Sequence, residues 1–181
     1  MIFFKSKHYT YGNLSIKLTF RIMSIEMHKT KILFVCLGNI CRSPMAACVF
    51  RHLAKEKGVE NQWVVHSAGI GSWYVGGSGD NRMLMTLKKH KVEAEHRVRQ
   101  VRESDFHEFD IIFGMDEENV KTLKQMAPPS CKAKIELFGI HDPEGERIIR
   151  DPYYDSDLKG FEKVYEQCVR CSKALLESYH K

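Results

Sequence analysis

The residues that could carry chemistry begin at Cys36, where the sequence reads Cys36-Leu-Gly-Asn-Ile-Cys-Arg42-Ser43. Five residues between a cysteine and an arginine can curl the backbone so that its N–H groups point inward, which makes an anion-binding nest at a helix N-terminus. Gly38 permits the dihedral angles of a tight curl, and Arg42 adds a planar pair of donors suited to phosphate oxygens. The pattern predicts a phosphate-binding loop, whose other members are Leu37, Gly38, Asn39, Ile40, Cys41 and Ser43.

Cys36 is the candidate nucleophile of this loop. Nearby cations and a helix N-terminus stabilise a thiolate, so we expect Cys36 to be ionised at neutral pH. A thiolate in a phosphate cradle can attack phosphorus in line, and the cradle stabilises the charge of the transition state. A C-x5-R match also occurs by chance, with the cysteine in the core and Arg42 on the surface. The position of the motif, between a strand and a helix start, favours the catalytic interpretation.

Strands and helices alternate around this loop. Residues 31–37 form a nearly continuous apolar run, typical of a strand buried on both faces, and Ser43-Pro44 predicts a helix start with Ser43 as its cap. Further strands are predicted at 62–67, 110–115 and 134–138, and helices at 44–58, 82–91, 116–126 and 158–179. The alternation predicts an α/β fold with three layers, in which helices flank both faces of a four-stranded parallel sheet. The phosphate loop then joins the first strand to the first helix, where ligands bind in such folds.

The bulk composition sets the broad class of protein. The chain has 181 residues, of which 43% are hydrophobic and 28% charged, as in a single soluble domain. The net charge of +5 favours anionic substrates and is too small to predict nucleic acid as a partner. No apolar run is long enough to cross a membrane. The six cysteines are expected as reduced thiols in the cytoplasm.

The first 29 residues differ from the rest. Residues 1–25 contain no Asp or Glu, a pattern that a mitochondrial presequence can show. The interpretation that we favour is a disordered N-terminal extension, with Met23 or Met27 as the usual start of translation. The sequence therefore divides into an extension at 1–29 and one catalytic domain at 30–181.

From Lys31 to about Tyr179 the chain resembles the low-molecular-weight protein tyrosine phosphatases, also known as an acid phosphatase family. The strongest matches are the stretch from Val35 to Pro44 and the later Asp151-Pro-Tyr-Tyr154. Two motifs so far apart, in the expected order, are highly specific. The resemblance implies that the domain at 30–181 is a hydrolase of phosphotyrosine and small aryl phosphates, which acts through a phosphocysteine and needs no metal or cofactor.

The resemblance also implies roles for individual residues. Cys36 would be the nucleophile and Arg42 the phosphate clamp. Asp151 would protonate the leaving oxygen and then serve as the base for hydrolysis of the phosphocysteine; without the first motif, Asp151-Pro would be read as a solvated turn. A supporting hydrogen-bond network would comprise Asn39, Ser43, Ser67 and His96, with the Ser43 hydroxyl beside the thiolate and Asp116 holding His96 from behind.

Substrate selectivity is expected to come from an aromatic wall made of Trp73, Tyr153 and Tyr154. Such faces stack against a substrate ring, and a phosphoserine would not reach Cys36 at the floor of a deep pocket. A related branch that acts on phosphoarginine carries Thr where this chain has Ile40, so Ile40 favours tyrosine.

Three further cysteines have predicted roles. In the family, a cysteine at the position of Cys41 can form a reversible disulfide with the nucleophile, so redox regulation is expected. Cys168 and Cys171 form a C-x-x-C pattern within a helix and without a second ligand pair, so core packing is expected there rather than zinc.

The chain departs from the family pattern at two places. Ala47 stands where Glu is common, and the loop at 76–79 lacks a proline. The effect of these changes on the turnover number and on modulation by small molecules stays open.

The expected substrates are phosphotyrosine proteins, and the expected inhibitors are phosphate, vanadate or sulfate-like anions. The protein is expected to be a monomer or weak dimer. Neither nucleic acid nor a membrane is expected as a partner. Two alternatives remain. A thiol-dependent arsenate reductase would need further redox cysteines near the site and would not need Asp151. A phosphotyrosine-binding module would not need Cys36, Arg42 and Asp151 together.

Overall fold

A computed structural model describes residues 29–179 of the chain. The extension predicted at 1–29, with both candidate start methionines, lies outside the described residues except for Lys29. The elements are β1 (Thr30–Cys36), α1 (Arg42–Glu56), η1 (Glu60–Gln62), β2 (Trp63–Gly69), α2 (Asn81–Lys89), α3 (Asp105–Glu108), β3 (Ile111–Gly114), α4 (Glu117–Met126), β4 (Lys134–Leu137), η2 (Phe138–His141) and α5 (Lys159–Ser178).

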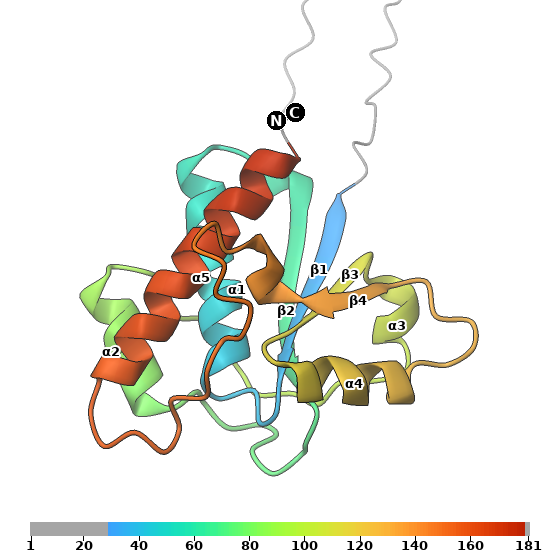
Figure 1. The fold of residues 1–181 in the computed structure, drawn as a ribbon, viewed down its shortest axis with the longest axis horizontal. Coiled ribbons are helices and arrows are strands. Elements are labelled where there is room, and N and C mark those ends of the chain that lie inside the picture. Colours follow the sequence, from blue (N-terminus) through green and yellow to red (C-terminus); the bar gives the residue numbers. More distant parts are fainter. Residues whose placement is uncertain (1–28, 180–181) are drawn as a thin grey trace, which may run out of the picture.

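The four strands form one sheet in the order β2-β1-β3-β4, and every neighbouring pair is parallel. The predicted four-stranded parallel sheet is therefore confirmed. β1 pairs with β2 on one side and with β3 on the other, so it lies inside the sheet. The loops that follow β1 and β2 emerge at the same end of the sheet (Figure 1), as parallel strands require.

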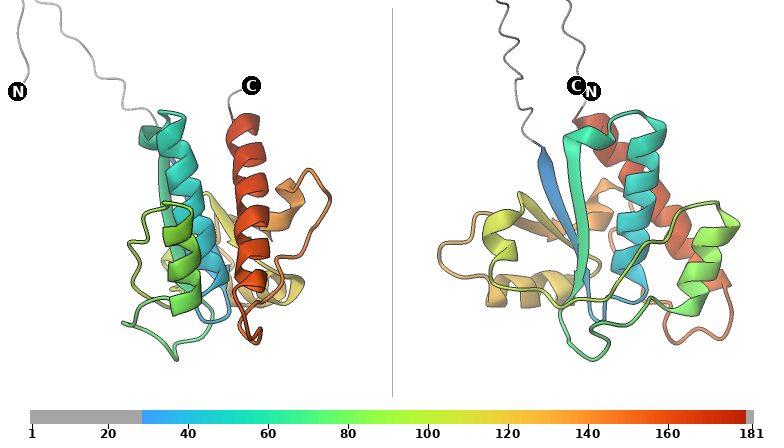
Figure 2. Two further views of the ribbon diagram at one scale, coloured as in Figure 1. Left: turned by 90° about the vertical axis from the view of Figure 1, so that its left-hand side faces the viewer. Right: turned by 180° about the vertical axis from the view of Figure 1, so that it is seen from behind.

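Helices cover both faces of the sheet, which confirms the predicted three layers. Viewed from behind, α3 and α4 lie on one side of β1 and β2, and α1, α2 and α5 lie on the other (Figure 2). Alternate residues of β1 enter the two cores: Ile32 and Phe34 pack with α1 and α5, whereas Leu33 and Val35 pack with α3 and α4. This two-sided burial explains why residues 31–37 form an apolar run rather than an alternating one.

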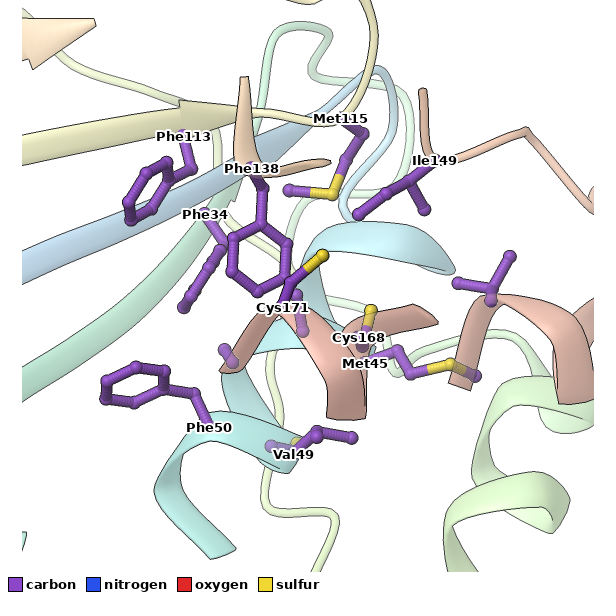
Figure 3. Close-up of a cluster of buried hydrophobic side chains, with 14 of the residues drawn as sticks. Phe34, Met45, Val49, Phe50, Phe113, Met115, Phe138, Ile149, Cys168 and Cys171 are labelled. Atoms are coloured by element: carbon purple, nitrogen blue, oxygen red, sulfur yellow. The ribbon is translucent and has the colours of Figure 1, made fainter. Parts of the chain in front are cut away.

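The larger core is built around aromatic rings. The ring of Phe34 lies 4.8 Å from that of Phe138 and 5.5 Å from that of Phe113, measured between centroids. Cys168 and Cys171, both fully buried, pack into the same cluster from α5 (Figure 3). Their predicted role in core packing is confirmed, and burial raises the pKa of both thiols.

The start of α1 differs from the prediction. Ser43 is the second residue of α1 rather than its cap, and the cap position belongs to Cys41, which makes no side-chain cap hydrogen bond. The Ser43 hydroxyl contacts the sulfur of Cys36 instead, at 3.1 Å. Pro44 still fits, because the first backbone N–H groups of a helix have no partner within it.

The long helix α5 is amphipathic, with one face in the core and charged residues on the other. Among residues 29–179, no helix is long and apolar enough to cross a membrane.

Replacing Phe34 by Ala should lower the free energy of unfolding by about 3–5 kcal/mol, because the ring is fully buried against other rings and its removal leaves a cavity. Urea denaturation measures this. Tyr154→Ala, at a side chain that is 91% exposed, is the control and should change stability by less than about 0.5 kcal/mol. Equal effects of the two substitutions would contradict the assignment of Phe34 to the core.

Candidate active site

The phosphate loop begins where β1 ends. Cys36 is the last residue of β1 and is 3% exposed. Its sulfur lies 3.1 Å from the Ser43 hydroxyl, which comes from the first turn of α1. Between residues 38 and 41, the backbone N–H groups of the loop donate to no other part of residues 29–179. A buried sulfur thus lies beside a turn whose donors are free to bind an anion.

Asn39 fixes the conformation of this turn. Its φ of 56° lies in the left-handed region, which Asn tolerates better than most residues. The side-chain amide donates to the hydroxyls of Ser43 and Ser67, at 2.9 and 3.0 Å. Its oxygen accepts the backbone N–H of Arg99 at 3.1 Å. The fully buried carboxamide therefore ties the loop to α1, β2 and the segment before α3.

His96 supports the same turn from outside. Its Nε2 lies 2.8 Å from the Asn39 carbonyl oxygen, and because a carbonyl can only accept, Nε2 carries the proton. Burial lowers the pKa of His96 and nearby Arg51 lowers it further, against the effect of this hydrogen bond. The imidazole is therefore a neutral donor at pH 7. The structure brings together the four predicted members of the network, Asn39, Ser43, Ser67 and His96.

Asp116 does not hold His96, contrary to the prediction. It follows β3 and caps α4, where its side chain accepts the N–H of Asn119 at 2.7 Å. Its other oxygen binds Nη1 of Arg42 at 2.6 Å. His96 reaches the loop from a different segment, beside Gly79, so Asp116 supports the arginine and not the histidine.

Arg42 is held between two carboxylates. Nη1 binds Asp116 and the carbonyl of Ile149, and Nη2 binds Asp151 at 2.6 Å. The guanidinium side chain is only 4% exposed, and its Nε has no hydrogen-bond partner among the described residues. The clamp predicted for phosphate therefore pairs with the predicted general acid in this structure and keeps its Nε–H and one N–H of Nη2 uncommitted among the described residues.

The loop that carries Asp151 is anchored on α5. Arg170 binds the buried carboxylate of Asp142 with Nε at 2.9 Å and Nη2 at 2.8 Å, and these hydrogen bonds lower the pKa of Asp142. Gln167 donates to two loop carbonyls, at 2.7 and 3.3 Å. At Ile149 the loop joins the end of β3 through a backbone hydrogen bond to Met115. The approach of Asp151 to Arg42 thus depends on side chains from the last helix.

A cavity of about 360 Å³ opens above the loop. The predicted wall residues all line it: Trp73 is 70% exposed, Tyr153 38% and Tyr154 91%. Sequence analysis missed Tyr74, which also lines the cavity and whose hydroxyl lies 3.3 Å from that of Tyr153. The Tyr74 ring packs against Gly38, where a Cβ would come within 3.2 Å. The position of Tyr74 directly after Trp73 in the sequence was the signal that could have identified it as a wall residue. The other lining residues are Cys36, Leu37, Gly38, Ile40, Cys41, Arg42 and Asp151.

Cys41 lies in the loop and is buried. Burial raises the pKa of its thiol, and the charges of Asp80 and Cys36 raise it further. Cys41 is therefore a neutral thiol at pH 7. Asp80, which sequence analysis did not single out, caps α2 and donates its backbone N–H to the Ile40 carbonyl at 2.8 Å.

The two departures from the family pattern lie outside the lining of the cavity. Ala47 is buried within α1, so no acid lies at this position. In the loop at 76–79, backbone hydrogen bonds join Gly76 and Gly77 to Val98, at 2.9 and 3.0 Å. These hydrogen bonds fix the backbone of a loop that lacks the proline common in the family.

Comparisons with known proteins agree on one family. The family model described as "Low molecular weight phosphotyrosine protein phosphatase" matches residues 31–181. Proteins of that name from Gallus gallus and Homo sapiens are 50% and 45% identical, over 82% and 86% of this chain and 95% and 99% of their own lengths. The crystal structures of Primo-1 and of DARP, a drosophila arginine phosphatase, each give a TM-score of 0.80 over 84% of this chain and 99% of theirs, at 44% and 37% identity.

Asn39→Ala should destabilise the protein by about 2 kcal/mol or more, because it leaves the part-buried backbone N–H of Arg99 without its acceptor and strains a left-handed residue. It should also weaken the binding of inorganic phosphate, measured by calorimetry. Asn39→Gly keeps the backbone conformation and should recover about 1 kcal/mol of stability. Wild-type stability and phosphate affinity in the Ala variant would show that the carboxamide does not shape the loop.

Proposed function

The chain belongs to the low molecular weight phosphotyrosine protein phosphatases, and on this premise we propose that it hydrolyses phosphotyrosine through a phosphocysteine on Cys36. Arg42 would bind the phosphate, and Asp151 would act as general acid and base. The observation that carries the proposal is the loop at 36–43, which brings together a buried sulfur with backbone N–H groups and an Arg42 Nε that have no partner within residues 29–179. A phosphoryl dianion needs these groups together.

In the first step the Cys36 thiolate attacks phosphorus, and a sulfur–phosphorus bond forms as the bond to the tyrosyl oxygen breaks. Asp151 gives its proton to the departing oxygen, so that tyrosine leaves as a neutral phenol. The Ser43 hydroxyl, 3.1 Å from the sulfur, stabilises the thiolate before the attack. The backbone N–H groups and Arg42 stabilise the charge on the transferring group.

In the second step a water molecule attacks the phosphocysteine. The Asp151 carboxylate takes a proton from this water, the sulfur–phosphorus bond breaks, and inorganic phosphate and the Cys36 thiolate are released. The same carboxyl group serves both steps, because it is ionised after the first. The contact between Asp151 and Arg42 supports this assignment, since it places the carboxyl at the phosphate-binding side chain.

The substrate class follows from the cavity. Its wall of Trp73, Tyr74, Tyr153 and Tyr154 suits an aromatic ring, while Cys36 lies buried at the floor. Ile40, which also lines the cavity, places an apolar side chain where the phosphoarginine branch has a threonine. Phosphotyrosine proteins are therefore the proposed substrates, and phosphate, vanadate and sulfate-like anions the proposed inhibitors.

A reducing compartment such as the cytoplasm is the proposed location, supported by the free thiols of all six cysteines.

The central test is hydrolysis of p-nitrophenyl phosphate and a phosphotyrosine peptide in the presence of EDTA. The wild type should hydrolyse both, and Cys36→Ser should be inactive. Asp151→Ala should hydrolyse the phosphotyrosine peptide more slowly by roughly the 10²–10⁴-fold expected for the loss of a general acid. Its loss with p-nitrophenyl phosphate should be smaller, because p-nitrophenolate leaves more readily without a proton. A phosphoserine peptide and a phosphoarginine peptide are the negative controls for the substrate class.

An inactive, freshly reduced wild type would refute catalysis and direct attention to phosphotyrosine binding and arsenate reduction. Activity that survives Cys36→Ser would refute the phosphocysteine.

Redox regulation is a second part of the proposal. Peroxide would convert the Cys36 thiolate to a sulfenic acid with release of hydroxide, and the Cys41 thiol would then displace water from it to form a disulfide. Cys41 is suited to the second role, because its neutral thiol does not compete for peroxide and it lies in the same loop.

Peroxide should therefore inactivate the wild type, and dithiothreitol should restore most of the activity. In Cys41→Ser the inactivation should become irreversible, because a sulfenic acid without a resolving thiol proceeds to sulfinic acid. Recovery of activity after a timed peroxide exposure measures this. Equal recovery in the two proteins would argue against a protective role for Cys41.

A further inference from the structure

One side chain joins the loop that carries Asp151 to the phosphate loop. Arg82 lies in the first turn of α2, and its guanidinium binds the Asp80 carboxylate through Nε at 3.0 Å and Nη2 at 2.8 Å. It also donates to two backbone carbonyls just after Asp151. Nη1 lies 2.6 Å from the oxygen of Asp155, and Nη2 lies 3.0 Å from the oxygen of Tyr153.

Asp80 extends this connection to the phosphate loop. Its backbone N–H donates to the Ile40 carbonyl at 2.8 Å, and its side chain accepts the N–H of Arg82 as the cap of α2. The guanidinium hydrogen bond lowers the pKa of Asp80, so the pair is ionic at neutral pH. A continuous path of hydrogen bonds therefore runs from Ile40 through Asp80 and Arg82 to the carbonyls of Tyr153 and Asp155.

The surroundings of Arg82 keep this connection in place. The guanidinium carbon lies 4.6 Å from the centre of the Phe161 ring in α5. The carboxylate of Asp155 lies close against Gly160, where a Cβ would come within 1.8 Å of its oxygen. Tyr153 N–H in turn donates to the Asp151 carboxylate at 3.1 Å. The position of the carboxyl group thus depends on a loop that Arg82 holds by its backbone.

Resting on the proposed function, we propose that Arg82 is a positioning residue for the general acid, which holds Asp151 over the leaving oxygen by fixing the backbone at Tyr153 and Asp155. A planar guanidinium can bind a carboxylate and two carbonyls at once, which the single ammonium of a lysine does not reproduce. Arg82 itself does not line the cavity, so it acts through the loop and not on the substrate.

The test compares two leaving groups. Phenyl phosphate releases a basic phenolate that needs a proton, whereas p-nitrophenolate leaves readily without one. A displaced general acid should therefore slow phenyl phosphate more. In Arg82→Gln, kcat/KM for phenyl phosphate should fall by roughly 10- to 100-fold, the cost of a misplaced group, and that for p-nitrophenyl phosphate by a clearly smaller factor. We choose kcat/KM because it covers the step in which the leaving group departs.

Three further variants sharpen the result. Arg82→Lys keeps the charge and the aliphatic stem, and it should show the same dependence on the leaving group. Combined with Asp151→Ala, Arg82→Gln should cause no further loss with phenyl phosphate, because a missing acid cannot be displaced. Arg102→Gln, at an exposed arginine without side-chain hydrogen bonds to other described residues, is the control and should behave as wild type.

Equal losses for both leaving groups, or a loss that multiplies with that of Asp151→Ala, would overturn the proposal. Thermal unfolding measures whether the Arg82 variants fold. If neither variant folds, Arg82 has a structural role and the proposal is overturned as well. These outcomes differ from failure of the proposed function, in which the freshly reduced wild type is inactive or Cys36→Ser keeps the activity of the wild type.

Discussion

The site depends first on the carboxamide of Asn39. A turn that presents free N–H groups to an anion is unstable by itself, because nothing inside the turn satisfies them. Here Asn39 takes the strained left-handed conformation, and the hydrogen bonds from its buried carboxamide to α1, β2 and Arg99 offset the cost of that strain. His96 adds a bond to the carbonyl of the same residue. The sheet and α1 thus position Cys36, and the curl of the loop is held mainly by the side chain of Asn39, with His96 in support.

The electrostatics of the site centre on Arg42. A guanidinium that is 96% buried requires compensation, and Asp116 and Asp151 provide it. Of the five N–H donors of the guanidinium, three bind Asp116, Ile149 and Asp151, so the Nε–H and one N–H of Nη2 remain available among the described residues for a bound phosphate. The negative charges of the two carboxylates lower the net gain from binding an anion, which favours release of inorganic phosphate after turnover. Asp116 therefore has two functions, as the cap of α4 and as a partner of Arg42.

Sequence reasoning recovered what short-range patterns determine. The apolar run at 31–37 predicted a strand inside the sheet, and the C-x5-R-S spacing placed Cys36 beside the start of α1. It failed where a side chain serves a distant segment: Ser43 was read as a cap although its hydroxyl faces the sulfur, and Asp116 was assigned to His96 although it binds Arg42. Arg82 gave no signal, because the two carbonyl groups that it holds lie about 70 residues further along the chain. Such contacts depend on the path of the loops, which no local pattern encodes.

The anchoring of the Asp151 loop has a consequence for biosynthesis. Gln167 and Arg170 of α5 hold residues 142–148, and Gly160, also in α5, makes room for Asp155. A ribosome delivers β1, the phosphate loop and α1 first and α5 after every other described element. During translation the segment of the nucleophile is therefore synthesised well before the helix that anchors the loop of the acid. The acid can therefore be held beside the phosphate loop only after α5 has emerged and docked.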